Sequence, residues 1–426
     1  MKIGIIVSFF DFRADVRDLI KELQSMGHEV VLFARSGELA SIQQQQMPGV
    51  VYREIREDIS NWRNRLLEYA FLLFKKLPKS RHNYYLMELF KISNAPSSKA
   101  KFIGKITLAI QRLGINTVSY DFLIQQLQYS GNTHLDDIDQ FIGFTEFPSD
   151  YLAARVVKEK KPLKVYVYSW DHPCKHTRFS KAFYYMVWSD CIKNDLLELQ
   201  HVPAGQVKVV GATQFSYIWD YKQQVYSQAS KPFPYPYVYY CCAIGIKELV
   251  PQEVAIIKTI AAKLATIQPD WKLVVRPYPV LDAWGMYKTL HAVSNIILDD
   301  DYRKNPFPSP KAANDDKYAK IQAARLVLHT GSTIGLEACL LDTPAFLIDF
   351  GYGKNRKGLS VYGFIHQYQN EKYLLDRRGG IESLNTLGEM LRTSEMPTHH
   401  SQEIAANFPL NSMKHMAMKI IDDTKN

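Results

Sequence analysis

A short turn rich in glycine and hydroxyl side chains, residues 330–333, follows the apolar segment 326–329 and leads into a helical pattern. Backbone N–H groups at the start of a helix, together with the positive end of its dipole, favour an anion such as phosphate. Glycine lets the backbone approach a ligand closely, and serine or threonine can cap the helix or donate to phosphate oxygens. One helical turn further on, Glu337 can accept hydrogen bonds from ribose hydroxyls. An ordinary capped junction is the alternative to a phosphate site made of Thr330, Gly331, Ser332 and Thr333.

A rigid loop follows a second apolar segment, 273–276. Pro277 and Pro279 restrict the backbone directly after this predicted strand, and ligands bind beyond the carboxyl ends of strands in open α/β sheets. Arg276 can pair with a phosphate and Tyr278 can stack on a base. We therefore predict that Arg276, Tyr278 and Pro279 contact a nucleotide, with a stiff loop and a salt-bridged arginine as the alternative.

A third set of polar residues follows the apolar segment 165–168. Asp171 and His172 come next in the chain, and either side chain can act as a general base or bind a sugar hydroxyl. A histidine in a loop is also a common surface residue, which is the alternative for His172. Arg178 lies nearby, and Glu146 and Asp150, after the predicted strand 141–144, are rival carboxylates at an equivalent position.

Neither a metal site nor a membrane-spanning segment is predicted. No set of histidine, aspartate or cysteine residues recurs at ligand spacing, and the acidic runs 299–301 and 315–316 are typical of solvated turns. The five cysteines lack CxxC spacing, which indicates a reducing compartment. A strand-like segment begins at residue 3, leaving no room for a signal peptide, and no apolar run approaches ~20 residues. We expect a cytoplasmic protein.

Strand-like and helical patterns alternate along the first half of the chain. The apolar run 3–7 is typical of a buried parallel strand, and 15–26 has the apolar spacing of a helix. The intervening turn 8–13 contains no glycine, so the GxGxxG fingerprint of NAD and FAD enzymes is absent. This alternation predicts a doubly wound parallel sheet over 1–219, with a helical, basic insertion at 60–130.

A proline-rich segment separates this half from a second alternating series. The chain of 426 residues is too long for one core, and prolines at 232, 234 and 236 predict a linker over 220–236. A second Rossmann-like domain is expected at 237–405. The last segment, 406–426, should form a terminal helix that packs back on the first domain. The predicted fold class is therefore α/β, with two doubly wound domains and a cleft between them.

The order of these motifs resembles GT-B glycosyltransferases. Three segments in particular resemble bacterial surface-carbohydrate transferases, a group that includes polysialyltransferases, capsular Kdo transferases and CDP-glycerol glycerophosphotransferases. In those families an arginine or histidine with a His-Pro pair, and a later turn rich in serine and threonine, hold the donor nucleotide. Here Tyr278 stands where that pair carries histidine. The segments are Val187–Phe215, Lys272–Pro279 and His329–Ala338.

The resemblance implies a glycosyltransferase that uses a nucleotide sugar as substrate, without a separate cofactor or metal, in capsule or lipopolysaccharide synthesis. The donor would bind the C-terminal domain, and a glycan or lipid-linked acceptor the N-terminal domain. Asp171 would be the base with His172 in reserve, and Glu146 and Arg178 would contact the acceptor. A GT-B-like sugar-nucleotide epimerase and a non-catalytic nucleotide- or glycan-binding module are the alternatives.

The charge of the chain is concentrated in one stretch. With 52 basic and 43 acidic residues the net charge is +9, and residues 62–112 contain eleven basic residues against two acidic ones. The rest is nearly balanced, which argues against a nucleic-acid partner. Trp62, Leu66, Tyr69, Leu73 and Phe74 recur at helical spacing among these cations, which predicts a peripheral contact with the anionic inner face of the cytoplasmic membrane. Packing of this stripe on the first sheet, or binding of a polyanionic glycan, are the alternatives.

Overall fold

The computed structural model describes most of the chain as two compact units. The first unit comprises Met1–Gln214 together with Asn411–Asn426, and the second comprises Phe215–Leu410. The predicted linker 220–236 therefore begins inside the second unit, and part of it lies outside the described residues. The described residues are 1–57, 61–79, 81–93, 95–129, 131–145, 147–223, 232–243, 247–278, 283–300, 310–351, 353, 380–393 and 398–422.

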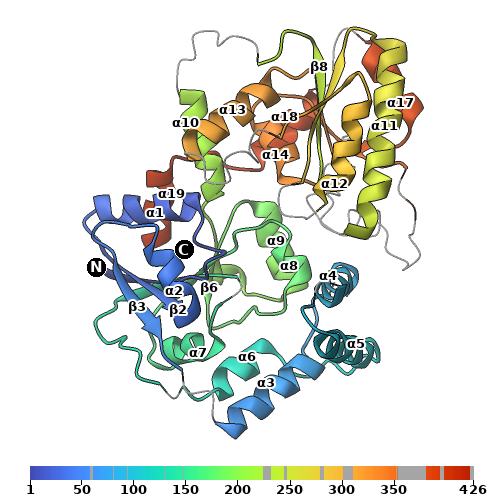
Figure 1. Ribbon diagram of the computed structural model, residues 1–426. Coiled ribbons are helices and arrows are strands. Elements are labelled where there is room, and N and C mark those ends of the chain that lie inside the picture. The colour runs from blue at the N-terminus through green and yellow to red at the C-terminus, as the bar shows by residue number, and fades with distance from the viewer. Residues whose placement is uncertain are drawn as a thin grey trace. The chain divides into compact units, whose positions relative to one another are not determined.

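The first unit is built on a seven-stranded parallel sheet in the order β3-β2-β1-β4-β5-β6-β7 (Figure 1). The chain adds strands on one side of β1 and then resumes on the other, so the sheet has a switch point between β1 and β4. Side chains of β1 and β4 are almost entirely buried, as expected for parallel strands covered on both faces. The strands are β1 Lys2–Ile6, β2 Glu29–Arg35, β3 Val51–Ile55, β4 Gln140–Phe144, β5 Leu163–Tyr166, β6 Tyr184–Val187 and β7 Val207–Val209.

Helices connect these strands as the apolar spacing predicts. In α1 the side chains of Val16, Leu19, Ile20 and Leu23 are buried, and Gly27, with a φ of 83°, follows the helix end. Between β3 and β4 the described residues form the helices α3 to α6, of which α3 packs against α5 and α6. The helices of this unit are α1 Ala14–Ser25, α2 Ser36–Gln43, α3 Trp62–Phe74, α4 Arg81–Ser93, α5 Ser98–Arg112, α6 Tyr120–Gln126, α7 Asp150–Lys158, α8 His172–Lys175, α9 Asp190–Leu199, the 3₁₀ turn Ala204–Gln206 and α19 Met413–Ile421.

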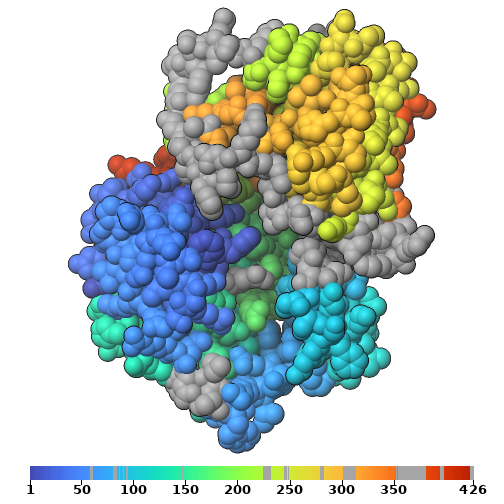
Figure 2. Space-filling view, viewed as in Figure 1, coloured from blue at the N-terminus to red at the C-terminus, as the bar shows by residue number. Residues whose placement is uncertain are grey.

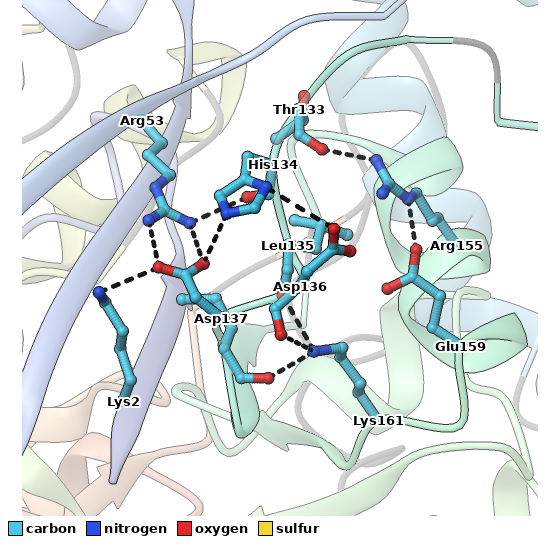
Figure 3. A network of polar contacts seen from close by, with 11 residues as sticks. Lys2, Arg53, Thr133, His134, Leu135, Asp136, Asp137, Arg155, Glu159 and Lys161 are labelled. Atoms are coloured by element: carbon cyan, nitrogen blue, oxygen red, sulfur yellow. Dashed lines mark hydrogen bonds and ion pairs between the residues drawn. The ribbon is translucent and has the colours of Figure 1, made fainter.

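A network of ion pairs holds the segment that leads into β4 (Figure 3). Asp137 accepts from both terminal nitrogens of Arg53, each at 2.6 Å, and its Oδ2 lies 2.9 Å from Nζ of Lys2. Hydrogen bonds from Arg53 outweigh partial burial and hold the pKa of Asp137 well below its usual range. Lys161 donates to three backbone carbonyl oxygens within 135–138. The network therefore fixes the start of β4 against β1 and β3.

The second unit contains a six-stranded parallel sheet in the order β10-β9-β8-β11-β12-β13. Its switch point lies between β8 and β11. The strands are β8 Tyr237–Cys241, β9 Lys272–Arg276, β10 Ile296–Leu298, β11 Val327–His329, β12 Ala345–Ile348 and β13 Gly380–Ile381. The helices are α10 Ser216–Gln223, α11 Val250–Ile267, α12 Trp284–Tyr287, α13 Pro310–Gln322, α14 Thr333–Leu340, α17 Leu384–Arg392 and α18 His399–Ala406, with 3₁₀ turns at Thr213–Phe215, Lys247–Leu249 and Lys288–Ala292.

The two parallel sheets confirm the predicted α/β class with two Rossmann-like doubly wound halves. In the space-filling view the first half of the chain is blue to green and the second half yellow to orange (Figure 2). The terminal helix α19 packs against α1, and Met413, Met416, Ala417 and Ile420 are buried. Residues at the two ends of the sequence thus share one core.

The contact between α19 and α1 generates a stability prediction with a control in the same helix. Met416 is 1% exposed and Met418 is 50% exposed. Met416→Ala should lower the free energy of unfolding by about 2–4 kcal/mol because it leaves a cavity, whereas Met418→Ala should change it by less than about 0.5 kcal/mol. Urea titration followed by circular dichroism measures both. Equal losses in the two variants would contradict the packing of α19.

Candidate functional site

The predicted phosphate turn lies at the switch point of the second sheet. Residues 330–333 follow β11, and β11 pairs directly with β8 although the two strands are far apart in the sequence. At such a point the connections leave to opposite sides of the sheet, which opens a crevice beyond the strand ends where ligands bind in α/β proteins. The turn after β11 and the segment after β8 therefore flank the position at which folds of this kind bind ligands.

Local hydrogen bonds form the turn and begin α14. Ser332 is the N-cap, and its Oγ accepts from the backbone N–H of Ile334 at 3.1 Å. Gly331 has a φ of 82°, a conformation that favours glycine. The N–H groups of Gly331 and Ser332 both point to Nδ1 of His329, at 3.3 and 3.4 Å. A phosphate bound to these two amides would replace the imidazole as their acceptor.

His329 accepts hydrogen bonds from the backbone of this turn, a role that was not predicted from the sequence. Its side chain is completely buried, and burial together with the nearby His400 lowers its pKa to about 3. The ring is therefore neutral at pH 7, and because Nδ1 accepts hydrogen bonds the proton is assigned to Nε2. A Cβ atom on Gly335 would lie 2.5 Å from this ring. Gly335 in the first turns of α14 therefore allows the imidazole to occupy its place.

Glu253 of α11, a second residue that the sequence did not reveal, connects the turn after β11 with the segment after β8. Its Oε1 accepts from the backbone N–H of Ala243 after β8 at 3.3 Å and from the hydroxyl of Thr330 at 3.4 Å. Its Oε2 accepts from the hydroxyl of Tyr287 at 2.6 Å. The side chain is fully buried, and this burial raises its pKa to about 7 despite these hydrogen bonds. Glu253 thus links Thr330 to the segment after β8 through a carboxyl group that titrates near neutrality.

The carboxylate of Glu337 faces a lysine. Nζ of Lys317 on α13 lies 2.9 Å from Oε1 and 2.8 Å from Oε2 of Glu337, and both side chains are largely buried. Glu337 therefore lies close to the predicted phosphate turn, but it is already ion-paired. A ribose hydroxyl that bound this carboxylate would share it with Lys317.

Arg276 lies in a buried network centred on Asp299. Its Nη1 is 2.8 Å from Oδ2 of Asp299, and Nζ of Lys320 is 2.8 Å from Oδ1. Burial would raise the pKa of Asp299, but the two cations outweigh it and the pKa is lowered. Asp299 is only 3% exposed, so the expectation that the run 299–301 forms a solvated turn is wrong at this residue. The hydroxyl of Tyr239 completes the network by donating to Asp299.

Of the remaining residues that were predicted to contact a nucleotide, only some lie within the described residues. Tyr278 is half-buried after β9, and Pro279 lies outside the described residues. Thr330 is buried, whereas Gly331, Ser332 and Thr333 are partly exposed. The structure thus places Thr330, Ser332 and Glu337 around the first turn of α14. Arg276 stands at the end of β9, two strands from β11 in the sheet order.

In the first unit, Asp171 is engaged by its neighbours. It precedes α8, accepts from Oγ of Ser169 at 2.7 Å and forms an ion pair with Lys175. Burial would raise the pKa of Asp171, but Lys175 and His172 outweigh it and the pKa is lowered. His172 is buried, with its ring centre 4.7 Å from that of Tyr168 and 4.4 Å from that of His176. Asp171 is therefore an ionised partner of Lys175 at neutral pH and a weak base.

The rival polar residues of this unit also form contacts with one another. Nε of Arg178 lies 3.1 Å from Oδ2 of Asp150, and the hydroxyl of Tyr120 donates to Oδ1 of Asp150 at 2.8 Å. Glu146 lies outside the described residues. A carboxyl group near Asp150 was missed. Glu57, which follows β3, has a pKa of about 7 because burial raises it, with Asp150 and Glu68 adding to this effect against Arg35.

The remaining features, neither of which was predicted, are a metal site and a membrane-spanning helix. Within the described ranges no group of three or more histidine, cysteine, aspartate and glutamate residues is arranged to hold a metal ion. Among the helices that the structure describes, none combines the length and apolar character needed to cross a membrane.

Comparisons with known proteins identify the fold. No protein-family model matches the chain, and no curated protein sequence matches it. Solved structures resemble it over nearly the whole length. A UDP-GlcNAc 2-epimerase from Methanocaldococcus jannaschii is 11% identical with a TM-score of 0.50, covering 99% of each chain. A glycosyltransferase from Rickettsia africae is 10% identical with a TM-score of 0.44, covering 99% of each chain, and MurG from Acinetobacter baumannii is 14% identical with a TM-score of 0.45, again covering 99% of each.

The resemblance to the M. jannaschii structure, together with the two parallel sheets, shows the GT-B fold that the sequence motifs predicted. At this level of identity the likeness concerns the fold alone. The reaction therefore has to be argued from the residues of this chain.

The pKa of Glu253 predicts how stability changes with pH. In the folded protein this carboxyl keeps its proton up to about pH 7, while in the unfolded chain it loses it near its ordinary value of 4.5. Its contribution to stability is therefore complete below pH 4.5 and is lost as the pH rises through about 7. Tyr287 and Cys242, which face it, have raised pKa values and stay neutral in this range.

Glu253→Gln removes this titration. Between pH 5 and pH 8 the free energy of unfolding of the variant should rise relative to the wild type by roughly 2–3 kcal/mol. Urea titrations of both proteins at each pH measure the difference, and taking the difference cancels other groups such as His329. A difference that does not change with pH would show that Glu253 is ionised in the folded protein.

Proposed function

We propose that the protein is a nucleotide-sugar-dependent glycosyltransferase that transfers a sugar to a glycan or lipid-linked acceptor in the synthesis of a bacterial envelope polysaccharide, such as capsule or lipopolysaccharide. The donor binds the second unit and the acceptor binds the first. The segments 187–215, 272–279 and 329–338, which resemble surface-carbohydrate transferases, support this choice of pathway.

The observation that carries the proposal is the set of groups at the switch point of the second sheet. The N-cap turn of α14 supplies backbone N–H groups and hydroxyls for a phosphate, and Glu337 stands one turn further on for a ribose. The M. jannaschii epimerase of the same fold was solved with UDP-GlcNAc and UDP, ligands of the class proposed here.

The same groups suit the chemistry of glycosyl transfer. Breaking the bond between sugar and phosphate leaves negative charge on the nucleotide, and fixed N–H dipoles and cations stabilise a charge that develops there. Asp299 holds Arg276 and Lys320 in position before any ligand arrives. Preorganised cations need no rearrangement at the moment of reaction, which is what makes such groups effective.

Thermal unfolding with different donors tests the nucleotide site. A ligand that prefers the folded state raises the unfolding midpoint, so one of the CMP-, UDP-, GDP- or CDP-linked sugars should raise it. Glu337→Ala should weaken binding of that donor by about 1.5–3 kcal/mol, the size expected for a hydrogen bond to a charged acceptor. Lys317→Met is the matched control, because it breaks the same ion pair and keeps the carboxylate.

Equal losses of affinity in Glu337→Ala and Lys317→Met would show that the ion pair affects donor binding only through the structure of the site. The carboxylate of Glu337 would then make no direct hydrogen bond to the donor. No midpoint shift with any of the four donors would contradict the proposed function.

The fold of the M. jannaschii protein makes an epimerase the second candidate. An epimerase converts its nucleotide sugar without an acceptor, whereas a transferase leaves the sugar nucleotide intact apart from slow hydrolysis. Incubating the protein with the donor selected by thermal unfolding, and analysing the sugar by NMR, separates them. Conversion to an epimer would replace the transferase proposal.

The base of the reaction generates a separate prediction. A general base works best when its pKa is close to the working pH. Glu57 follows β3 and Asp171 follows β5, so both lie at the carboxyl edge of the same parallel sheet, where ligands bind in α/β proteins. Glu57, with a pKa of about 7, meets the condition for a base, whereas the ion pair between Asp171 and Lys175 would first have to break. We therefore propose Glu57 as the base in place of Asp171.

Glu57→Gln should lower kcat by at least about 100-fold, with donor affinity unchanged. In the wild type, kcat should rise with pH through about 7 as Glu57 loses its proton. Asp171→Asn should mainly lower the unfolding midpoint, because it leaves Lys175 buried without its partner. A stable, inactive Asp171→Asn beside an active Glu57→Gln would restore Asp171 as the base.

A further inference from the structure

The helix α3 exposes three large apolar side chains and buries the polar Asn64 beside the apolar Phe71. Trp62, Leu66 and Tyr69, spaced four and three residues apart, are 73%, 56% and 62% exposed. On the opposite face Asn64 is fully buried, and its amide donates to the carbonyl of Gln128 at 2.5 Å and accepts from the N–H of Gln128 at 3.0 Å. The apolar stripe of α3 therefore faces away from the core of the unit.

The neighbouring helix α5 also exposes large apolar side chains, while it buries Thr107, Leu108 and Gln111. Phe102 and Ile106 are 64% and 42% exposed, and Leu113, just after the helix, is 76% exposed. Gln111 is buried instead, accepting from the hydroxyl of Tyr84 at 2.7 Å and donating to the carbonyl of Leu72 at 3.0 Å. The helices α3 and α5 pack against each other (Figure 1). Both therefore contribute exposed apolar side chains to the same part of the first unit.

The exposure of these side chains bears on the alternative that the apolar stripe of α3 packs on the first sheet. Trp62, Leu66 and Tyr69 are exposed and do not pack on the first sheet, whereas Leu73 and Phe74 of the same predicted stripe are half-buried. Lys75, one of the eleven cations, is buried close to the ring of Tyr84, and burial lowers its pKa to about 8. It therefore does not belong to the cationic surface.

Exposed cations flank the apolar side chains on both helices. Glu68 and Glu88 are the two acidic residues of 62–112, and Nζ atoms of Lys75 and Lys91 lie 3.8 and 3.7 Å from the carboxylate of Glu88. The surface of α3 and α5 is therefore both apolar and strongly positive. The exposed basic residues of the two helices are Arg63, Arg65, Lys99, Lys101, Lys105 and Arg112.

We propose that this face, formed by the exposed residues of α3 and α5, docks on the surface of an anionic lipid bilayer. Trp, Leu and Phe side chains enter the boundary between headgroups and acyl chains, while lysine and arginine reach lipid phosphates. A soluble polyanion would use the cations but leave the apolar side chains in water. A neutral protein surface would cover the apolar side chains but leave the cations without partners. An anionic membrane uses both sets.

The inference goes beyond the proposed reaction and does not depend on it. Sedimentation of the full-length protein with vesicles tests it directly. We expect binding to vesicles of phosphatidylglycerol and phosphatidylcholine at low salt, at least about tenfold weaker binding at 0.5 M salt, and little binding to pure phosphatidylcholine, because salt screens surface charge.

Two variants separate the contributions, each with a control that changes the same residue types elsewhere. Arg65→Gln/Lys101→Gln/Lys105→Gln should abolish binding, whereas Lys247→Gln/Lys258→Gln/Lys288→Gln, on exposed lysines of the second unit, should not. Leu66→Gln/Phe102→Gln/Ile106→Gln should also abolish it. Its control, Val51→Gln/Tyr184→Gln/Met418→Gln, changes apolar residues that are 49–50% exposed in the first unit. Circular dichroism verifies that each variant is folded.

Wild-type protein that stays in the supernatant with both kinds of vesicle at low salt overturns the proposal. So does a concentration-dependent dimer, seen by analytical ultracentrifugation, that the Leu66/Phe102/Ile106 variant abolishes while vesicle binding persists. Binding that survives the apolar variant but not the charge variant would also overturn docking by this face, leaving electrostatic adsorption alone.

Discussion

The buried carboxyl group of Glu253 is the constraint on which the candidate nucleotide site depends. It accepts hydrogen bonds from three segments that approach the switch point of the second sheet: the chain after β8, the end of α12 and the turn after β11. Removing an ionised carboxylate from water is costly, so a group in this position either finds partners or keeps its proton. Glu253 does both, since three donors surround it and its pKa is raised to about 7. Loss of one donor would therefore disturb the other two segments as well.

The surrounding charges are arranged so that each buried ion has a partner. Asp299 is paired with Arg276 and Lys320, and Glu337 with Lys317. Buried ion pairs contribute little net stability, because desolvation offsets most of the attraction between the charges. Their value here is that they fix cations at the carboxyl end of β9 and on α13. Breaking one of them leaves a buried charge without compensation, which is why the structure of the site is sensitive to single substitutions.

The fold could be predicted from the sequence because the signals are local. Continuous apolar runs such as 3–7 and 326–329 mark buried parallel strands, and the cap turn at Ser332 marks the start of α14. The site could be predicted only where a residue follows a strand directly, as Arg276 and the turn 330–333 do. Glu253 stands 34 positions before Tyr287, so its burial depends on tertiary contacts that no local pattern contains. Asp299 illustrates the same limit. An acidic run is expected to face solvent, and the sequence does not show that Arg276 and Lys320 pair with Asp299 inside the unit.

The orientation of α3 shows why an amphipathic pattern alone does not say where a helix face lies. The apolar side chains of Trp62, Leu66 and Tyr69 would ordinarily direct this stripe into the core. It turns outward because the other face buries Phe71 against the ring of Tyr120 and matches Asn64 to the backbone of Gln128, 64 positions later, with a donor and an acceptor. Burying Asn64 costs little once both of its hydrogen bonds are made, whereas exposing the stripe to water forgoes the burial of three large side chains. Large apolar side chains left exposed on two adjacent helices indicate a partner that covers them. The excess of arginine and lysine around these side chains matches the charge of anionic lipid.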